Sequence, residues 1–480
     1  MNFKNTLVAV AAFGAATLAV AAPTVSNVRM IQPTGSRNVT IKYKLTEDAV
    51  VTLEVFTNAV PYAAEGWASI GGEAVCTAQG AVWRKVTSAD ADGSGDYTIV
   101  WRPIDTWKDD QGNCLNVEDG CAKAVVTAWA LDNTPDYMVV DISTGTQPDT
   151  QRYYPAVEFL PGSEPGQRGA ITNNPIYKTS KLVMRKIMAK DIEWTMGSSS
   201  QETDRHKYGR ENTRQLSLTN NYYIAVFETT QAQWSLVSSK RPNPSYFNNA
   251  AYKAYRPVEQ VCYNEIRMAD DSTSANGGAE EWPGRPYPGS FLALLSDRTG
   301  IDFDLPTEAQ WEFAARAGHG SPFWNDGSAI LGGKNDANLS LLGRYVYNGG
   351  WLDSATTVSA QNCDTANGTA AVGSYPPNSW GLYDMHGNVC EWCIDWFRNV
   401  LTAENGYYPP DDHGTPIAKE YRDYDGRAVR GGSFGGLTAD ARDSFGNAGN
   451  CRPAYRQQKG PQYRESYVGF RVVCPADFSN

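Results

Sequence analysis

The sequence lacks the features of a nucleic-acid-binding or membrane-spanning protein. Its formal net charge is −11, and no stretch gathers Lys and Arg into a basic patch, so the positive surface that contacts a phosphate backbone is missing. Apolar stretches such as 124–131 are interrupted by polar residues and fall well short of the roughly 20 residues that a membrane helix needs. We therefore expect no nucleic-acid partner and no membrane span.

The sequence is also poor in histidine. Its four histidines are scattered without the spacing of metal ligands: His206, His319, His386 and His413. Non-haem iron typically takes two histidines and a carboxylate, and a nucleophilic serine needs a base such as histidine, which Ser433 lacks in the sequence. Neither an iron centre nor a serine hydrolase is expected.

The N-terminus resembles an export signal. Lys4 precedes an Ala/Val/Leu-rich run that starts at Leu7 and ends in Ala19-Val20-Ala21. A charged start, a short apolar run and an A-x-A exit are typical of a secretory signal peptide. We predict a signal peptide over 1–21 and a mature protein exported to a periplasm or the medium. Nine cysteines in an exported chain suggest disulfides, and the odd count leaves at least one thiol unpaired.

The length of 480 residues exceeds the usual size of one hydrophobic core, so we expect two domains. Over 22–143 apolar and polar residues alternate, which predicts an all-β sandwich of immunoglobulin or fibronectin type with a structural or adhesive role. A disulfide between Cys114 and Cys121 would close a short loop there. Residues 144–180 are polar with several Pro and Gly, which predicts a linker.

A second domain is predicted over 181–476. Its early strands are expected at 181–187 and 222–228, and two short helices begin at Thr230 and Thr307, where a Gln three residues on completes a capping box. Gly318 is expected to stop the second helix. The long remainder is rich in Gly, Asn, Asp, Trp and Tyr, so calcium or disulfides are expected to hold its loops.

Eight motifs follow one another through this second domain: "WTMGS", "YIAVFETTQAQW", "RPVEQVCYNEI", "DLPTEAQWEFAARAG", "VGSYPPNSWGLYDMHGNVCEW", "VRGGSF", "CRPAYR" and "VGFRVV". In this order they resemble the formylglycine-generating enzyme or sulfatase-modifying-factor family, over Lys181 to about Cys474. The resemblance implies a loop-rich, C-type-lectin-like α+β fold held by calcium. The family includes a copper oxidase that converts a sulfatase cysteine to formylglycine, a domain of iron sulfoxide synthases, and ligand-binding relatives without demonstrated chemistry.

The Cys390-x-x-Cys393 pair looks like a redox or zinc motif, but its neighbours predict a strand. On a strand the two side chains point to opposite faces, and no second Cys-x-x-Cys or His pair completes a zinc site. We expect each thiol to pack singly or to pair with a distant cysteine such as Cys451 or Cys474.

Calcium is the predicted cofactor, because it takes carboxylate and carbonyl oxygens gathered in a turn. The segment "DMHGNVCE" can supply the side chains of Asp384 and Glu391 and the carbonyls of Gly387 and Val389, which match a calcium loop of the family. The resemblance implies a second site formed by Asn338, the Leu339 carbonyl, Asp364 and the Ala366 carbonyl.

Copper is not expected. Cu(I) prefers closely spaced thiolates, which in the family lie three and eight positions after the Ser of the Gly-Gly-Ser block. Here those positions, counted from Ser433, are Gly436 and Ala441. Cys390 takes the place of an active-site tryptophan, and copper chemistry would require Cys390 and Cys451 to converge, which the sequence gives no reason to expect.

The predicted function is therefore that of an exported, non-catalytic binding or surface-display scaffold. Its ligand face is expected where the family has its active site, near Ser433, Arg452 and Tyr455, because loops on a rigid scaffold are where recognition concentrates. The ligand class stays open between peptide, protein and glycan. The alternative is an oxidase, or another oxygen-dependent enzyme, that acts on a peptidyl cysteine through an unusual thiol arrangement.

Overall fold

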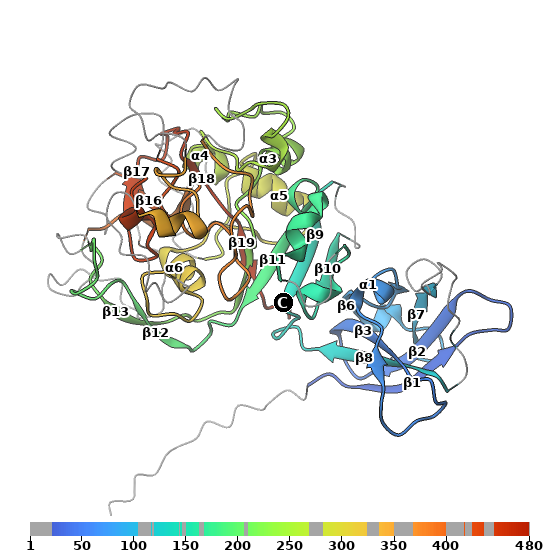
Figure 1. Ribbon diagram of the computed structural model, residues 1–480. Coiled ribbons are helices and arrows are strands. Elements are labelled where there is room, and N and C mark those ends of the chain that lie inside the picture. Colours follow the sequence, from blue (N-terminus) through green and yellow to red (C-terminus); the bar gives the residue numbers. More distant parts are fainter. Residues whose placement is uncertain are drawn as a thin grey trace, which may run out of the picture.

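The computed structural model describes residues 22–103, 117, 120–143, 145, 150–162, 168–205, 210–267, 282–323, 336–349, 368–399, 417, 425–435 and 446–479. The predicted signal peptide, Cys114, Asp364, Ala366 and positions 436 and 441 lie outside these ranges. Figure 1 shows two lobes: a small lobe formed by β1 to β8 and a large lobe formed by the rest of the described chain.

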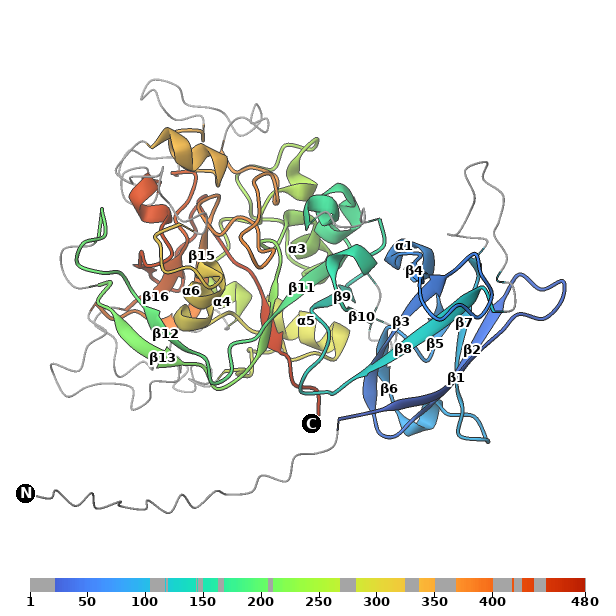
Figure 2. The same cartoon turned by 60° about the horizontal axis from the view of Figure 1, so that its bottom comes forward.

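The small lobe consists of short sheets with a short helix beside them, as Figure 2 shows from a second side. Its strands are β1 (Val25–Ile31), β2 (Val39–Leu45), β3 (Ala49–Thr57), β4 (Ala68–Ser69), β5 (Gln79–Gly80), β6 (Arg84–Val86), β7 (Tyr97–Trp101) and β8 (Ala122–Trp129), and α1 (Gly72–Val75) precedes β5. One sheet has the order β1-β2-β7-β5, and the other has the order β4-β3-β6 with β8 also paired to β3. The immunoglobulin or fibronectin assignment stays a prediction.

A five-stranded sheet connects the predicted first domain to the rest of the chain. Its order is β10-β9-β11-β14-β19, formed by β9 (Tyr137–Asp141), β10 (Gln151–Tyr154), β11 (Lys181–Ile187), β14 (Tyr222–Ala225) and β19 (Val473–Pro475). The strand β9 lies within the predicted sandwich and β10 within the predicted linker, yet both belong to this sheet. Ladder hydrogen bonds therefore cross the predicted domain boundary.

The large lobe surrounds this sheet with short elements and long connections. The strands β12 (Glu193–Met196) and β13 (Arg214–Ser217) form a separate pair, and a four-stranded sheet has the order β17-β16-β15-β18. These four are β15 (Cys390–Trp396), β16 (Arg427–Arg430), β17 (Gln457–Lys459) and β18 (Val468–Gly469), and the α-helices of the lobe are α3 (Gln231–Val237), α4 (Tyr263–Ile266), α5 (Phe291–Thr299) and α6 (Glu308–Arg316). Within the described ranges, no helix is both long and apolar enough to cross a membrane.

The two predicted capping boxes are confirmed. Thr230 caps α3 and Thr307 caps α6, and in each helix the Gln three residues on hydrogen-bonds back to the cap residue. The helix α6 ends at Arg316, and Ala317 adopts the left-handed conformation with φ 48°. The predicted stop, Gly318, follows directly and is also left-handed, with φ 85°.

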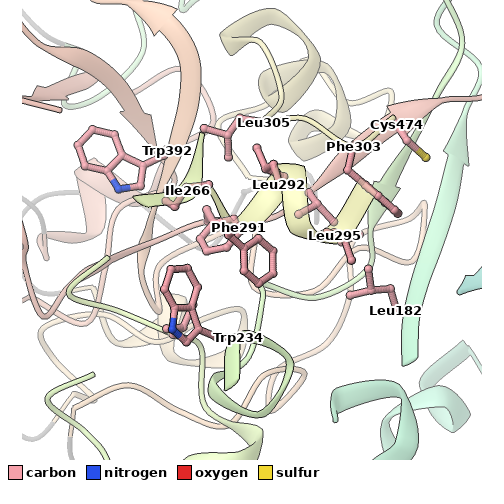
Figure 3. Packing of buried hydrophobic residues seen from close by; sticks show 14 of the residues in the cluster. Leu182, Trp234, Ile266, Phe291, Leu292, Leu295, Phe303, Leu305, Trp392 and Cys474 are labelled. Atoms are coloured by element: carbon pink, nitrogen blue, oxygen red, sulfur yellow. The ribbon is translucent and has the colours of Figure 1, made fainter. Parts of the chain in front are cut away.

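The main core of the large lobe combines aliphatic and aromatic side chains, as Figure 3 shows. Trp234 of α3 stacks on Phe291 of α5 with ring centroids 5.1 Å apart. The predicted strand around Cys390 is confirmed as β15, and all of its residues are buried. Cys390 belongs to this core, whereas Cys393 belongs to a different hydrophobic cluster, so the two thiols lie on opposite faces of the strand as predicted.

Candidate functional site

The three predicted ligand-contacting residues lie near one another but inside the protein. Ser433 follows β16, while Arg452 and Tyr455 follow the short 3-10 helix Ala448–Cys451. Their exposures are 0%, 1% and 8%. The family-derived positions therefore form part of the interior of the described chain, and a ligand would meet their neighbours first.

Arg452 is held by several acceptors. Its guanidinium donates to Glu202 at 2.6 Å and to both carboxylate oxygens of Glu211 at 2.8 and 3.0 Å. It also donates to the backbone carbonyls of Asp204 and Gly449. Burial alone would lower the pKa of Arg452, but these two carboxylates raise it above its usual range. Arg452 thus holds in place the segment after β12, which contains Glu202 and Asp204.

Cys390 and Cys451 converge around Ser433, although we did not expect them to meet. Cys390 interacts with the Ser433 side chain and Cys451 with its backbone. A Cβ added at Gly432 would lie 2.7 Å from the Cys451 sulfur, so only glycine leaves room for that thiol here. The structure therefore gathers two thiols at the position that the family resemblance assigns to the active site.

Both thiols are deeply buried, and this decides their protonation. Burial raises the pKa of Cys451 to about 12. Burial also raises the pKa of Cys390 well above its usual range, and the neighbouring Cys451 thiol adds to that effect. Because the thiolate is the form that attacks or binds metal, burial disfavours the reactive form of both thiols.

The described cysteines carry free thiols: Cys76, Cys121, Cys262, Cys390, Cys393, Cys451 and Cys474. Of the two alternatives left open for Cys390 and Cys393, single packing is therefore the one observed. Cys121 is free in the described chain, and its predicted partner Cys114 lies outside it.

The predicted calcium turn is built from left-handed residues. Asp384, Gly387 and Asn388 have φ of 57°, 92° and 61°, and a Cβ at Gly387 would lie 2.0 Å from the Arg344 carbonyl oxygen. One oxygen of Asp384, Oδ2, accepts the Gly373 amide at 2.7 Å. The other, Oδ1, is buried and has no partner within the described chain.

Glu391, the other carboxylate of the predicted turn, is already neutralised. Arg471 donates to it at 2.6 and 2.7 Å, and the Trp311 indole donates at 2.7 Å. All three side chains are fully buried. Its oxygens are therefore used by an ion pair and a hydrogen bond, which does not fit a calcium ligand.

Glu228 is the carboxylate that sequence reasoning missed. It accepts the Asn388 side-chain amide at 2.6 Å and the Val389 backbone amide at 3.1 Å. Burial raises its pKa well above the usual range, and the nearby Asp384 carboxylate adds to the shift. No local signal marks it, because the turn that it contacts is 160 residues away along the chain.

The Asp384 turn fits a cation in part. Burial raises the pKa of Asp384 to about 6, and a cation beside its partnerless Oδ1 would offset the cost of burying charge. Across the described ranges, however, no group of three or more His, Cys, Asp and Glu side chains is arranged to hold a metal ion. A calcium ion here would depend on Asp384, on Glu228 beside it and on backbone carbonyls. Of the second predicted site, Asn338 and Leu339 lie in the 3-10 helix Ala337–Leu341, and the other two residues lie outside the described chain.

A cavity of about 340 Å³ is lined in part by Glu202, the residue that accepts a hydrogen bond from Arg452. It lies between the β12–β13 pair and the C-terminal end of α6. Its lining includes Trp194, Ser199, Glu202, Thr213, Phe313 and Arg316. The motifs "WTMGS" and "DLPTEAQWEFAARAG" both contribute to its wall, but the sequence did not indicate that these two segments, about a hundred residues apart, would meet at a cavity.

The family model of the sulfatase-modifying factor enzyme 1-like domain matches residues 188–476, more than half of the chain. The formylglycine-generating enzyme of Streptomyces coelicolor is 34% identical over 177 residues, which are 37% of this chain and 48% of that protein. A serine/threonine-protein kinase, pkn1 of Chlamydia pneumoniae, is 33% identical over 169 residues, which are 35% of this chain and 20% of the kinase.

The chain thus spans about half the length or less of these relatives. Among solved structures, Treponema denticola variable protein 1 aligns with 62% of this chain and 96% of its own, with 24% identity and a TM-score of 0.40.

Proposed function

Because the chain belongs to the family of the sulfatase-modifying factor enzyme 1-like domain, we propose that it is an exported, non-catalytic member that uses the scaffold for binding or surface display. The observation that carries the proposal is the state of its thiols. Gly436 and Ala441 stand where the family resemblance expects copper thiolates. The two cysteines that do converge are buried with raised pKa values.

The distribution of the domain supports a role apart from oxidation. One similar protein is named a formylglycine-generating enzyme, and another is named a protein kinase. A scaffold that recurs in proteins of different activity does not by itself imply one chemistry. The small lobe that precedes the family domain fits a display or adhesive role, and the predicted signal peptide fits export.

We also propose a structural calcium ion at the Asp384 turn. The partnerless Asp384 Oδ1 and the raised pKa values of Asp384 and Glu228 support it. Asp384 would supply a side-chain oxygen, with Glu228 beside it and the Gly387 and Val389 carbonyls as the remaining predicted ligands. The ion would neutralise buried carboxylates and hold the turn.

The alternative function is oxidation of a peptidyl cysteine. One observation favours it: Cys390 and Cys451 meet around Ser433. If a Cu(I) ion drew the protons off both thiols, the pair could act as a two-thiolate site. The raised pKa values oppose this, because burial penalises the charged thiolate.

One experiment separates the two functions. The mature protein, loaded with copper, is incubated under oxygen with a peptide that carries Cys-x-Pro-x-Arg, and the peptide mass is measured, with a formylglycine-generating enzyme as the working control. We expect an unchanged peptide. Conversion of the cysteine to an aldehyde, lost in Cys451→Ser, would establish the oxidase and end the non-catalytic proposal.

A Cu(I) competition titration gives a second readout. We expect no tight one-to-one site in the wild-type protein. Tight binding that disappears in Cys451→Ser, with Cys262→Ser as the matched control for a buried thiol elsewhere, would support the alternative.

A further inference from the structure

We propose that the cavity lined by Trp194, Phe313, Glu202 and Arg316 is a carbohydrate-binding site that takes a neutral, hydroxyl-rich sugar ring. The inference rests on the binding role proposed above and names a ligand class for it. It does not depend on the calcium turn or on the thiols.

The cavity wall carries one charged group of each sign. Glu202 and Arg316 both line the cavity, and each is held in place by hydrogen bonds to other residues. Glu202 accepts from Arg452, and Arg316 donates to Glu312 at 2.8 Å and to the Gly197 carbonyl at 2.6 Å. A ligand of either net charge would meet one like charge in the wall, which disfavours its binding.

The cavity wall also offers groups for hydrogen bonds. Within the described chain, one carboxylate oxygen of Glu202 and the Nη1 group of Arg316 make no hydrogen bond. The carboxylate oxygen can only accept hydrogen bonds, and the guanidinium group can only donate them. Ser199 and Thr213 add exposed hydroxyls that can do both. Sugar hydroxyl groups donate and accept at once, so they match this mixed set of partners.

One side of the cavity wall is aromatic. Trp194 and Phe313 meet with ring centroids 5.2 Å apart, and Phe313 in turn lies 5.2 Å from Trp380. This row of rings fixes the half-buried Trp194 at the cavity. The C–H face of a pyranose packs on such a ring by burying apolar surface. A wall that is aromatic on one side and polar on the other suits a sugar, which has one apolar and one polar surface.

Size and rigidity agree with this ligand. A cavity of about 340 Å³ lies at the small end of ligand sites, whose volumes run from roughly 300 to 1,000 Å³. That is room for a monosaccharide or the end of a longer glycan. Because Arg452 and Glu312 hold the two charged groups, little ordering is needed on binding, and a pre-ordered site loses less affinity to entropy.

The test is saturation-transfer difference NMR on the mature full chain. The probes are millimolar methyl glycosides of glucose, galactose, mannose and N-acetylglucosamine, with glucuronic acid and glucosamine as charged counterparts. We expect saturation of ring protons in at least one neutral glycoside and less in its charged counterpart. Ser199→Trp, which fills the cavity from its exposed rim, should weaken binding about tenfold or more.

Two further variants keep the test decisive. Glu202→Gln keeps the shape but removes a charged acceptor, and we expect binding to weaken about tenfold because charge-assisted hydrogen bonds are the strong ones. Trp67→Ala removes an aromatic ring from the small lobe and should leave binding unchanged. A melting curve for each variant confirms that it is folded.

Three outcomes would overturn the inference. They are no saturation of any neutral glycoside, preferred binding of a charged probe, and binding that Ser199→Trp leaves intact. Failure here is distinct from failure of the non-catalytic proposal, because the peptide-oxidation assay is run on the same preparation. If the protein binds sugar and also oxidises the peptide, only the non-catalytic proposal is wrong. If it does neither, only the sugar inference is wrong.

Discussion

The two lobes place their ion pairs differently. In the small lobe the pairs are at the surface: the side chains of Arg29 and Asp96 are 52% and 9% exposed, and those of Lys42 and Asp92 are 31% and 40% exposed. The large lobe also has surface pairs, such as Arg464–Glu265 with side chains 44% and 14% exposed. Unlike the described part of the small lobe, it adds fully buried pairs, since both side chains are 0% exposed in Arg267–Asp304, Arg430–Glu312 and Arg471–Glu391. In the small lobe, where strands pair over long ladders, apolar packing is enough to hold the strands together. In the large lobe, where the elements are short and the connections long, buried ion pairs link the segments.

Arg471 illustrates this connection. It lies between β18 and β19 and donates to Glu391 of β15, to the Ala225 carbonyl of β14 and to the Tyr383 carbonyl. One side chain thus ties two sheets and the loop that leads into the predicted calcium turn. A buried ion pair is costly to break, because removing one partner leaves the other charge buried and unpaired.

The largest expected effect follows from breaking this pair. Arg471→Met should lower the free energy of unfolding by about 3–5 kcal/mol, since Glu391 would keep its charge in the core. Urea unfolding of the mature chain measures it. The matched control in the small lobe is Lys42→Met, which breaks a surface pair and should leave the urea midpoint almost unchanged. Equal losses in both variants would show that the comparison between the lobes is wrong.

Calcium removal should give the next largest effect and should act on the large lobe alone. If the Asp384 turn holds calcium, a chelator leaves two buried carboxylates without a cation and should lower the melting temperature by several degrees. Asp384→Ala should remove most of that response, whereas Asp92→Ala in the small lobe should keep it. If the melting temperature does not change when the chelator is added, a structural calcium ion is excluded.

Local signals in the sequence predicted local structure well. The capping boxes at Thr230 and Thr307 gave the starts of α3 and α6, and the residues around Cys390 gave the strand β15. The helix α5 was not predicted, although Ser290 caps its start and Gly300 adopts the left-handed conformation at its end. Those two signals could have located it.

Long-range partners could not be predicted in this way. Glu228 and Asn388 are 160 residues apart, and Arg452 and Glu202 are 250 residues apart. In neither pair do the residues around one member indicate which residue is its partner. For the same reason the predicted ligand residues proved to be buried, and the cavity beside Glu202 emerged only from the fold. The pairing of β9 with β10 and β11 likewise depends on those partner strands, so the residues of β9 alone do not predict it.

The pH dependence of stability should also differ in sign between the two lobes. In the large lobe, burial raises the pKa of Glu259 to about 8 from its ordinary value of 4.5, although the Tyr246 and Phe247 amides and the Arg256 charge oppose that shift. The folded state therefore binds a proton that the unfolded state releases. This contribution is fully present below about pH 4.5 and is lost as the pH rises to about 8. In the small lobe, hydrogen bonds from Ser94 and Lys42 lower the pKa of Asp92, so its contribution is lost only as the solution becomes strongly acidic.

Unfolding by urea at pH 5 and at pH 8.5 tests this difference. The wild-type protein should be less stable at pH 8.5, and Glu259→Gln should reduce that difference because its side chain does not titrate. Asp92→Asn should leave the change between pH 5 and 8.5 as it is, since Asp92 is ionised in both the folded and the unfolded state over this range. If Glu259→Gln keeps the full pH dependence, the proton is bound elsewhere, and Asp395, whose pKa is raised to about 7 by burial and by the Glu308 carboxylate, is the next residue to replace.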